Sequence, residues 1–282
     1  MQRRDTKVQE LQKVEEIVRQ LNIIDDTLFQ KMAEDVEFCE EMISTILQQN
    51  VIVKEVTPQN SIKNLQGRSV VLDALCELEN GKDCNVEVQK ADDDDHQRRV
   101  RYNTSCITAN ITEPGSKFED VPNVIAIYIS KFDMFKAGKT IYHIDRVVHE
   151  TGEVQDNGLQ EIYVNTKIND GTDIAELMRI FTEHDVYDFE KFPKVSKRKK
   201  QFKESEGGKK QVCDLVENYA RQCAEKAAKE AEEKVAKEAE NSALKLFKNG
   251  VSYEVVRASI TSLSDEKLQE IYRETASSRV NK

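Results

Sequence analysis

Two short segments with a β-strand pattern carry side chains that can hold a hard metal ion. Asp73 lies in residues 69–75, and Glu87 and Gln89 lie in residues 85–89. Phosphodiester hydrolysis assisted by Mg²⁺ needs two or more carboxylate oxygens converging on the cation, and a group that orients the attacking water. Asp73 and Glu87 are therefore candidate metal ligands, and Gln89 is a candidate for positioning or activating the water. A strand Asp beside a strand Glu-x-Gln is also common on solvent-facing sheet surfaces, and that structural interpretation is the alternative.

The turn between the two segments decides whether the carboxylates meet. Residues 79–82 are a strong hairpin signal, so the two segments should pair antiparallel. Side chains alternate along a strand, so a two-residue loop would put Asp73 and Glu87 on opposite faces of the hairpin. A three-residue loop that ends on Gly81 in the left-handed conformation puts them opposite each other. We predict the three-residue loop, with a bulge at Gly81.

A third carboxylate lies on a helix predicted over residues 27–49. Apolar residues recur there at spacings of three and four, and Glu40 falls inside their stripe. A carboxylate on a buried face needs a partner. If the stripe covers the sheet, Glu40 reaches the metal directly or through water. A salt bridge to Arg68 or to a nearby lysine is the alternative, and the sequence leaves both open.

Candidate phosphate ligands follow the second strand. Arg98, Arg101 and Tyr102 have helical spacing on a helix that the acidic run of residues 92–95 caps and that ends near Asn110. The planar fork of arginine and the hydroxyl of tyrosine can hold a scissile or neighbouring phosphate. A solvated helix face is the alternative interpretation.

The remaining periodicity predicts an α/β domain. A segment that is apolar on both faces, residues 124–129, is typical of a central strand covered by helices on either side. Further strands are expected at residues 51–53, 141–148 and 159–164, and a further helix at residues 172–183. Together with the predicted hairpin, these elements indicate an α/β layered fold.

The chain divides into four parts by composition. We expect a helical arm in residues 1–26, an α/β domain in 27–192, a basic linker with a long charged helix in 193–240, and a small helical segment in 241–282. A long helix rich in Ala, Glu and Lys is usually a solvated spacer or a weak coiled coil. The last segment is too small for a large core of its own, so a homo-oligomer through the C-terminal helices is an open alternative.

Composition narrows the class of protein. The net charge of −10 argues against a protein that coats DNA through its overall charge, but it is compatible with a local basic cleft. No stretch approaches the ~20 apolar residues of a membrane span, and the N-terminus lacks the apolar run of a signal peptide. We therefore expect a cytoplasmic protein with no membrane partner. The six cysteines contain no close pair, so we expect them to be reduced.

These motifs, in this order, resemble a known family. The Asp73 segment, the turn at Asn80-Gly81, residues 86–89, residues 98–102 and the strand at residues 124–129 look like the recombination-promoting nuclease and transposase group of the PD-(D/E)XK enzymes. The similarity covers residues 28–181, and a looser one covers residues 213–272.

The resemblance implies a restriction-endonuclease-like fold with a mixed central sheet flanked by helices and an all-α C-terminal extension. It also implies a DNA endonuclease that uses Mg²⁺, with Mn²⁺ as a substitute, in recombination, transposition or genome defence. Asp73 and Glu87 match the family's metal ligands, and Arg98 with Tyr102 matches its helix motif. Gln89 stands where the wider class has lysine; it has no charge but can orient a water.

Two alternatives remain at this stage. A nuclease that acts on RNA would use the same residues. A catalytically weak or inactive protein of this fold would act as a nucleic-acid-binding or oligomerising module.

Overall fold

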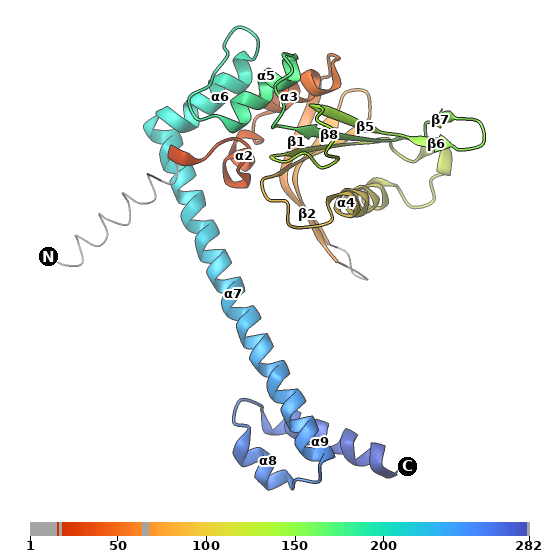
Figure 1. Cartoon of the computed structure of the whole chain (residues 1–282), viewed down its shortest axis with the longest axis vertical. Coiled ribbons are helices and arrows are strands. Elements are labelled where there is room, and N and C mark those ends of the chain that lie inside the picture. The colour runs from red at the N-terminus through yellow and green to blue at the C-terminus, as the bar shows by residue number, and fades with distance from the viewer. Residues whose placement is uncertain (1–15, 17–18, 64–67, 281–282) are drawn as a thin grey trace, which may run out of the picture. The chain divides into compact units, whose positions relative to one another are not determined.

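The computed structural model describes residues 16, 19–63 and 68–280 of the chain (Figure 1). Most of the predicted N-terminal arm lies outside the described residues. The chain forms two compact units, residues 1–216 and residues 217–282.

The first unit is built around a six-stranded mixed sheet. Its strands are β1 (Val53–Ile62), β2 (Val70–Leu78), β3 (Asp83–Gln89), β4 (Val124–Ser130), β5 (Ile141–Ile144) and β8 (Leu159–Asn165), in the order β1-β2-β3-β4-β8-β5. The three inner strands β3, β4 and β8 run parallel, and the outer pairings are antiparallel. Every residue of β4 is buried, which confirms it as the central strand predicted from its apolar pattern. A separate hairpin pairs β6 (Arg146–Val148) with β7 (Glu153–Gln155).

Helices cover both faces of this sheet (Figure 1). On one face, α2 (Asp26–Met32), α3 (Val36–Leu47), α5 (Asp173–Thr182) and α6 (Pro193–Glu204) enclose the larger apolar core. On the other face, α4 (His96–Ile111) packs over β2 and β4, and a short 3₁₀ turn, η1 (Phe118–Asp120), follows it. The predicted fold class, a mixed sheet flanked by helices in the restriction-endonuclease-like arrangement, is confirmed.

The helix predicted over residues 27–49 is two helices. The Asp35 side chain accepts a hydrogen bond from the Phe38 N–H at 3.1 Å and so starts α3, three residues after α2 ends at Met32. An aspartate at this position satisfies a main-chain donor that a continuous helix would bond to its own carbonyl. The apolar stripe survives the break, because Phe29 and Cys39 are both fully buried.

The basic segment predicted as a linker is part of the first unit. Val195 and Phe202 of α6 lie in the main core, and the Glu41 carboxylate accepts hydrogen bonds from the Lys194 and Val195 N–H groups at 3.2 and 2.7 Å. The fully buried Lys199 donates to the carbonyls of Ile180, Glu183 and Val186 at the end of α5, at 2.9, 2.5 and 3.0 Å. The apolar side chains of Val195 and Phe202 and the hydrogen bonds of the buried Lys199 therefore make α6 part of the core, although most of its residues are charged or polar.

The second unit is helical. It contains most of the long helix α7 (Glu206–Lys248), followed by α8 (Tyr253–Ser259) and α9 (Asp265–Val280). Its own small core contains Ala243, Phe247, Val256, Leu268 and Ile271. Among the described residues, no helix has the length and apolar character to cross a membrane.

Candidate metal and nucleic-acid site

The loop between β2 and β3 has the predicted length. The Leu78 N–H donates to the Lys82 carbonyl at 2.9 Å, which closes a three-residue loop, and Gly81 has a φ of 77°. Gly81 adopts this left-handed conformation without steric cost. The predicted turn is confirmed.

This loop sets the register that the site needs. The antiparallel ladder of β2 and β3 runs from Glu77 opposite Asp83 to Ala74 opposite Val86. Asp73 is the next residue and stands at the level of Glu87.

Asp73 lies where the strands become irregular. Its Oδ2 accepts a hydrogen bond from the Val88 N–H of β3 at 2.9 Å. On the other side of β2, Gln59 has a φ of 50° between residues paired with Leu72 and Ala74. The Asp73 side chain thus lies where backbone pairing between β2 and β3 ends. Its carboxylate is hydrogen-bonded to the neighbouring strand, and only 7% of the residue is exposed.

Glu87 points to the face of the sheet that α4 covers. Its Oε1 accepts hydrogen bonds from the Asn85 and Asn103 amides at 3.0 and 3.3 Å. Its Oε2 lies 3.2 Å from Nη2 of Arg99. With 2% exposure, Glu87 is a buried carboxylate held from both its own strand and the helix above it.

Gln89 is joined to Glu87 through the same arginine. Arg99 Nη1 donates to Gln89 Oε1 at 3.1 Å, so one guanidinium spans the two side chains. The two side chains therefore lie on one face of β3, as expected for residues two positions apart in a strand. The Gln89 amide nitrogen donates to the Ala91 carbonyl at 2.8 Å, which fixes the orientation of the amide.

The two carboxyl groups are costly to ionise together. Burial is the main cause that raises the pKa of Asp73 well above its ordinary value, followed by the charges of Glu87 and Asp26. Burial also raises the pKa of Glu87, against the opposing hydrogen bond from Asn85 and the charge of Arg99. Two acids that a neighbouring cation would keep ionised are typical of a functional site.

The donor set suits a hard cation. Beside the two carboxylates, the buried Asn85 Oδ1 has no hydrogen-bond partner among the described residues. Across the residues that the structure describes, no group of three or more His, Cys, Asp or Glu side chains is arranged to hold a metal. Mg²⁺ is usually bound through one or two carboxylates and retains several waters, so the oxygen donors present fit it.

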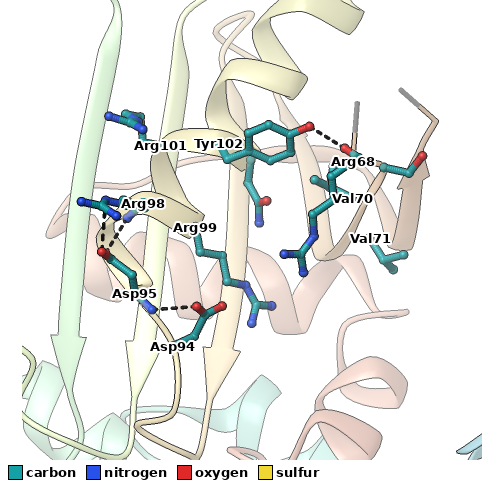
Figure 2. A pocket seen from close by; sticks show the side chains of 11 residues that line it. Arg68, Val70, Val71, Asp94, Asp95, Arg98, Arg99, Arg101 and Tyr102 are labelled. Carbon is teal, nitrogen blue, oxygen red and sulfur yellow. Dashed lines mark hydrogen bonds and ion pairs between the residues drawn. The ribbon is translucent and has the colours of Figure 1, made fainter. Parts of the chain in front are cut away.

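A cleft of about 660 Å³ lies beside this pair, between α4 and the start of β2. The following residues line it: Arg68, Ser69, Val70, Val71, Asp94, Asp95, Arg98, Arg99, Arg101, Tyr102 and Asn103. Figure 2 shows Arg98 and Arg101 turned to one side of α4 and Arg99 turned away from them. The three residues predicted to hold phosphate, Arg98, Arg101 and Tyr102, all line this cleft, and Tyr102 lies on the other side of α4 from the two guanidinium groups (Figure 2).

Local contacts hold several of these side chains. Asp95 caps α4 through the Arg98 N–H at 3.1 Å and pairs with Arg98 Nε at 3.2 Å. The Tyr102 hydroxyl donates to the Arg68 carbonyl at 2.6 Å, across the cleft (Figure 2). The acidic run thus serves partly to start α4, as its position in the sequence predicts.

The structure does not bring Glu40 to the pair. Its carboxylate accepts a hydrogen bond from the Val53 N–H at 3.0 Å, and Val53 pairs with Leu78. Asp73 lies five residues further along β2, which is roughly 16 Å at 3.3 Å per residue. In addition, α3 covers the face of the sheet opposite to the one that Glu87 points to. The apolar stripe located the helix correctly but carried no information about which face it covers.

The sequence interpretation missed three residues of the site: Asn85, Arg99 and Asn103. Period-two alternation in β3 places Asn85 on the face of Glu87 and Gln89. Arg99 and Asn103 have the same four-residue spacing as Arg98 and Tyr102, but they are rotated by about 100° toward the buried side of α4. That side was already indicated by Val100 and Ile107, which are both buried. The helical position relative to the apolar side was thus the signal available.

Comparison with known proteins places the chain in a family. Neither a curated protein nor a solved structure matches the chain. A family model described as PD-(D/E)XK nuclease family transposase matches residues 27–245, which include the whole sheet, the cleft and most of α7. The match spans well over half of the chain, and the protein therefore belongs to the PD-(D/E)XK nuclease family of transposases.

Proposed function

We propose that the protein is a DNA endonuclease that hydrolyses phosphodiester bonds with Mg²⁺, or with Mn²⁺ in its place. The observation that carries this proposal is the pair of buried carboxylates, Asp73 and Glu87, held at one level of β2 and β3 beside an arginine-lined cleft. Burying two acids side by side disfavours folding, and the arrangement is accounted for if a divalent cation binds there.

In this proposal the residues divide the work by position. Asp73 and Glu87 would hold the cation, and a divalent cation bound there would supply Lewis-acid chemistry at the scissile phosphate. Gln89, fixed through its amide nitrogen, orients the attacking water. Arg98 and Arg101 bind phosphate oxygens from the outer part of the cleft, because a guanidinium can form two parallel hydrogen bonds with them.

Tyr102 has a positioning role in the same scheme. Its hydroxyl donates to the carbonyl of Arg68 on the opposite wall of the cleft, so it fixes the distance between α4 and the start of β2. While that hydrogen bond is made, the hydroxyl has no second hydrogen to donate to a phosphate, so the neighbouring arginines would hold the phosphate. The description of the family suggests transposition as the setting for this activity, and recombination or genome defence is part of the proposal.

Nicking of supercoiled plasmid tests the proposal. We expect nicking by the wild-type protein with Mg²⁺ or Mn²⁺, and none in EDTA. The isosteric variants Asp73→Asn and Glu87→Gln should lose it, because each removes a ligand charge. Asp73→Asn can still accept from the Val88 N–H, and Glu87→Gln can still accept from the Asn85 and Asn103 amides, although it loses the acceptor for Arg99. Glu77→Gln is the matched control on the same hairpin, because the Glu77 side chain is 53% exposed and pairs with Lys54.

Two results would overturn the assignment. One is equal nicking by the wild type and the two isosteric variants. The other is plasmid binding without nicking at either metal, which would leave a nuclease-fold binding or oligomerising protein. The same assay with linear duplex DNA, single-stranded DNA and RNA separates a DNA enzyme from one that acts on RNA.

A further inference from the structure

Arg99 is the partner of the acidic pair that can leave it. The two groups bound to Glu87 Oε1 are neutral amides on buried residues, Asn85 and Asn103, both with 5% exposure or less. The group bound to Oε2 is the guanidinium of Arg99, whose side chain is 34% exposed and lines the cleft. A long side chain with a solvent-exposed path can change its rotamer without moving the backbone.

A bound cation and Arg99 would compete for the same carboxylate. Arg99 interacts electrostatically with Glu87, Tyr128 and Asp73, so its charge acts on both carboxylates of the site. A divalent cation held by the two carboxylates would meet the guanidinium at the same Oε2 and be repelled by it. Either the cation shares that oxygen with a like charge, or the arginine moves.

We propose that Arg99 is an exchangeable counter-ion: it pairs with Glu87 and Gln89 until a divalent cation takes Oε2, and it then turns into the cleft to bind the substrate phosphate. This inference rests on the proposed function, because it takes Asp73 and Glu87 as the metal site. The guanidinium also brings to this site the positive charge that Gln89, in the place of a lysine, does not have. Metal binding and phosphate binding would thereby be coupled through one side chain.

Metal affinity measured without nucleic acid tests the exchange. Mn²⁺ binding to the full-length protein, followed by titration calorimetry, should be about tenfold tighter in Arg99→Ala than in the wild type, which corresponds to about 1.4 kcal/mol. Arg98→Ala is the matched control, since Arg98 is the adjacent residue on α4, has a 78% exposed side chain and pairs with Asp95 instead. Its Mn²⁺ affinity should equal that of the wild type. An arginine that only holds the fold together predicts unchanged or weaker binding in Arg99→Ala, which would overturn the proposal.

DNA affinity provides the second readout. Ca²⁺, which usually supports binding without cleavage in Mg²⁺ sites, should tighten duplex binding by the wild type relative to EDTA. In Arg99→Ala this gain should shrink by about tenfold, the value of one lost charge-assisted phosphate contact. Arg98→Ala should weaken binding by the same factor with and without Ca²⁺. An undiminished gain in Arg99→Ala contradicts the exchange.

Two further variants keep the outcomes separable. Arg99→Lys retains the charge but cannot span Glu87 and Gln89 together, so its Mn²⁺ affinity should fall between those of the wild type and Arg99→Ala; if Arg99→Ala does not fold, this comparison decides. Asp73→Asn should abolish Mn²⁺ binding. If it does so while both Arg99 variants match the wild type, the metal site stands and the exchange fails. If Asp73→Asn binds Mn²⁺ as the wild type does, the proposed function itself fails.

Discussion

The Asp73→Asn variant should make the fold more stable while it removes the activity. Asparagine has the shape of aspartate, and its amide oxygen can still accept the 2.9 Å hydrogen bond from the Val88 N–H. The substitution removes a negative charge from a residue that is only 7% exposed. It also removes the repulsion between that charge and the charge of Glu87. Each unit by which folding raises the pKa of a carboxyl group costs about 1.4 kcal/mol at pH values above the raised pKa.

The expected size follows from that cost. Burial and the charge of Glu87 both raise the pKa of Asp73, so we expect the free energy of unfolding of the first unit to increase by about 1–3 kcal/mol in EDTA. For a unit of this size, each kcal/mol of that gain raises the Tm by about 2–4 °C. The chain contains no tryptophan, so scanning calorimetry is the suitable measurement, and it also separates the transition of residues 217–282.

Addition of Mg²⁺ should reverse the order of stability. A ligand at a thousandfold excess over its Kd adds about 4.1 kcal/mol to the protein that binds it, which exceeds the expected advantage of the variant, and the variant lacks a ligand carboxylate. The wild type should therefore gain in Tm with Mg²⁺, and Asp73→Asn should not. The exposed control Glu77→Gln should shift by less than about 0.5 kcal/mol in either buffer. A variant that is less stable than the wild type in EDTA, or equally stabilised by Mg²⁺, would refute the reasoning.

Three other substitutions have distinct expected outcomes. Lys199→Met should lower the free energy of unfolding of the first unit by about 2–4 kcal/mol, measured by urea titration, because three carbonyls at and after the end of α5 lose their buried donor; a change near zero would mean that these hydrogen bonds do not stabilise the unit. Glu40→Gln should leave both Mn²⁺ affinity and plasmid nicking unchanged, since its amide oxygen can still accept from the Val53 N–H, and a loss of metal binding would restore Glu40 as a ligand. Gly81→Ala should cost about 1–2 kcal/mol in thermal unfolding, purely from the left-handed backbone, because an added Cβ has nothing within 4 Å. Nicking should persist in that variant, and its loss would show that Gly81 does more than set the turn.

The hairpin could be predicted from sequence because its signals are local. The turn residues predict the hairpin, and side-chain alternation implies that a three-residue loop, rather than a two-residue one, puts Asp73 opposite Glu87; the loop then fixes the register. The central strand β4 and the helix α4 were equally clear, since each has an unambiguous apolar pattern and α4 has its cap at Asp95.

Other features depend on contacts between distant segments, which periodicity does not contain. Glu40 lies in an apolar stripe, but only the packing of α3 determines that the stripe covers the face away from Glu87. The segment around Lys199 has the composition of a linker, and its burial depends on the carbonyls that α5 offers. The contact between Arg99 and Glu87 joins a helix to a strand, and spacing along α4 alone favoured Arg98.

The most direct test of the metal site is a crystal of the protein soaked in Mn²⁺ and measured at the manganese absorption edge. We predict an anomalous peak between Asp73 and Glu87, about 2.0–2.2 Å from an oxygen of each carboxylate. No peak at that position, or a peak elsewhere in a protein that still nicks plasmid with Mn²⁺, would contradict the assignment.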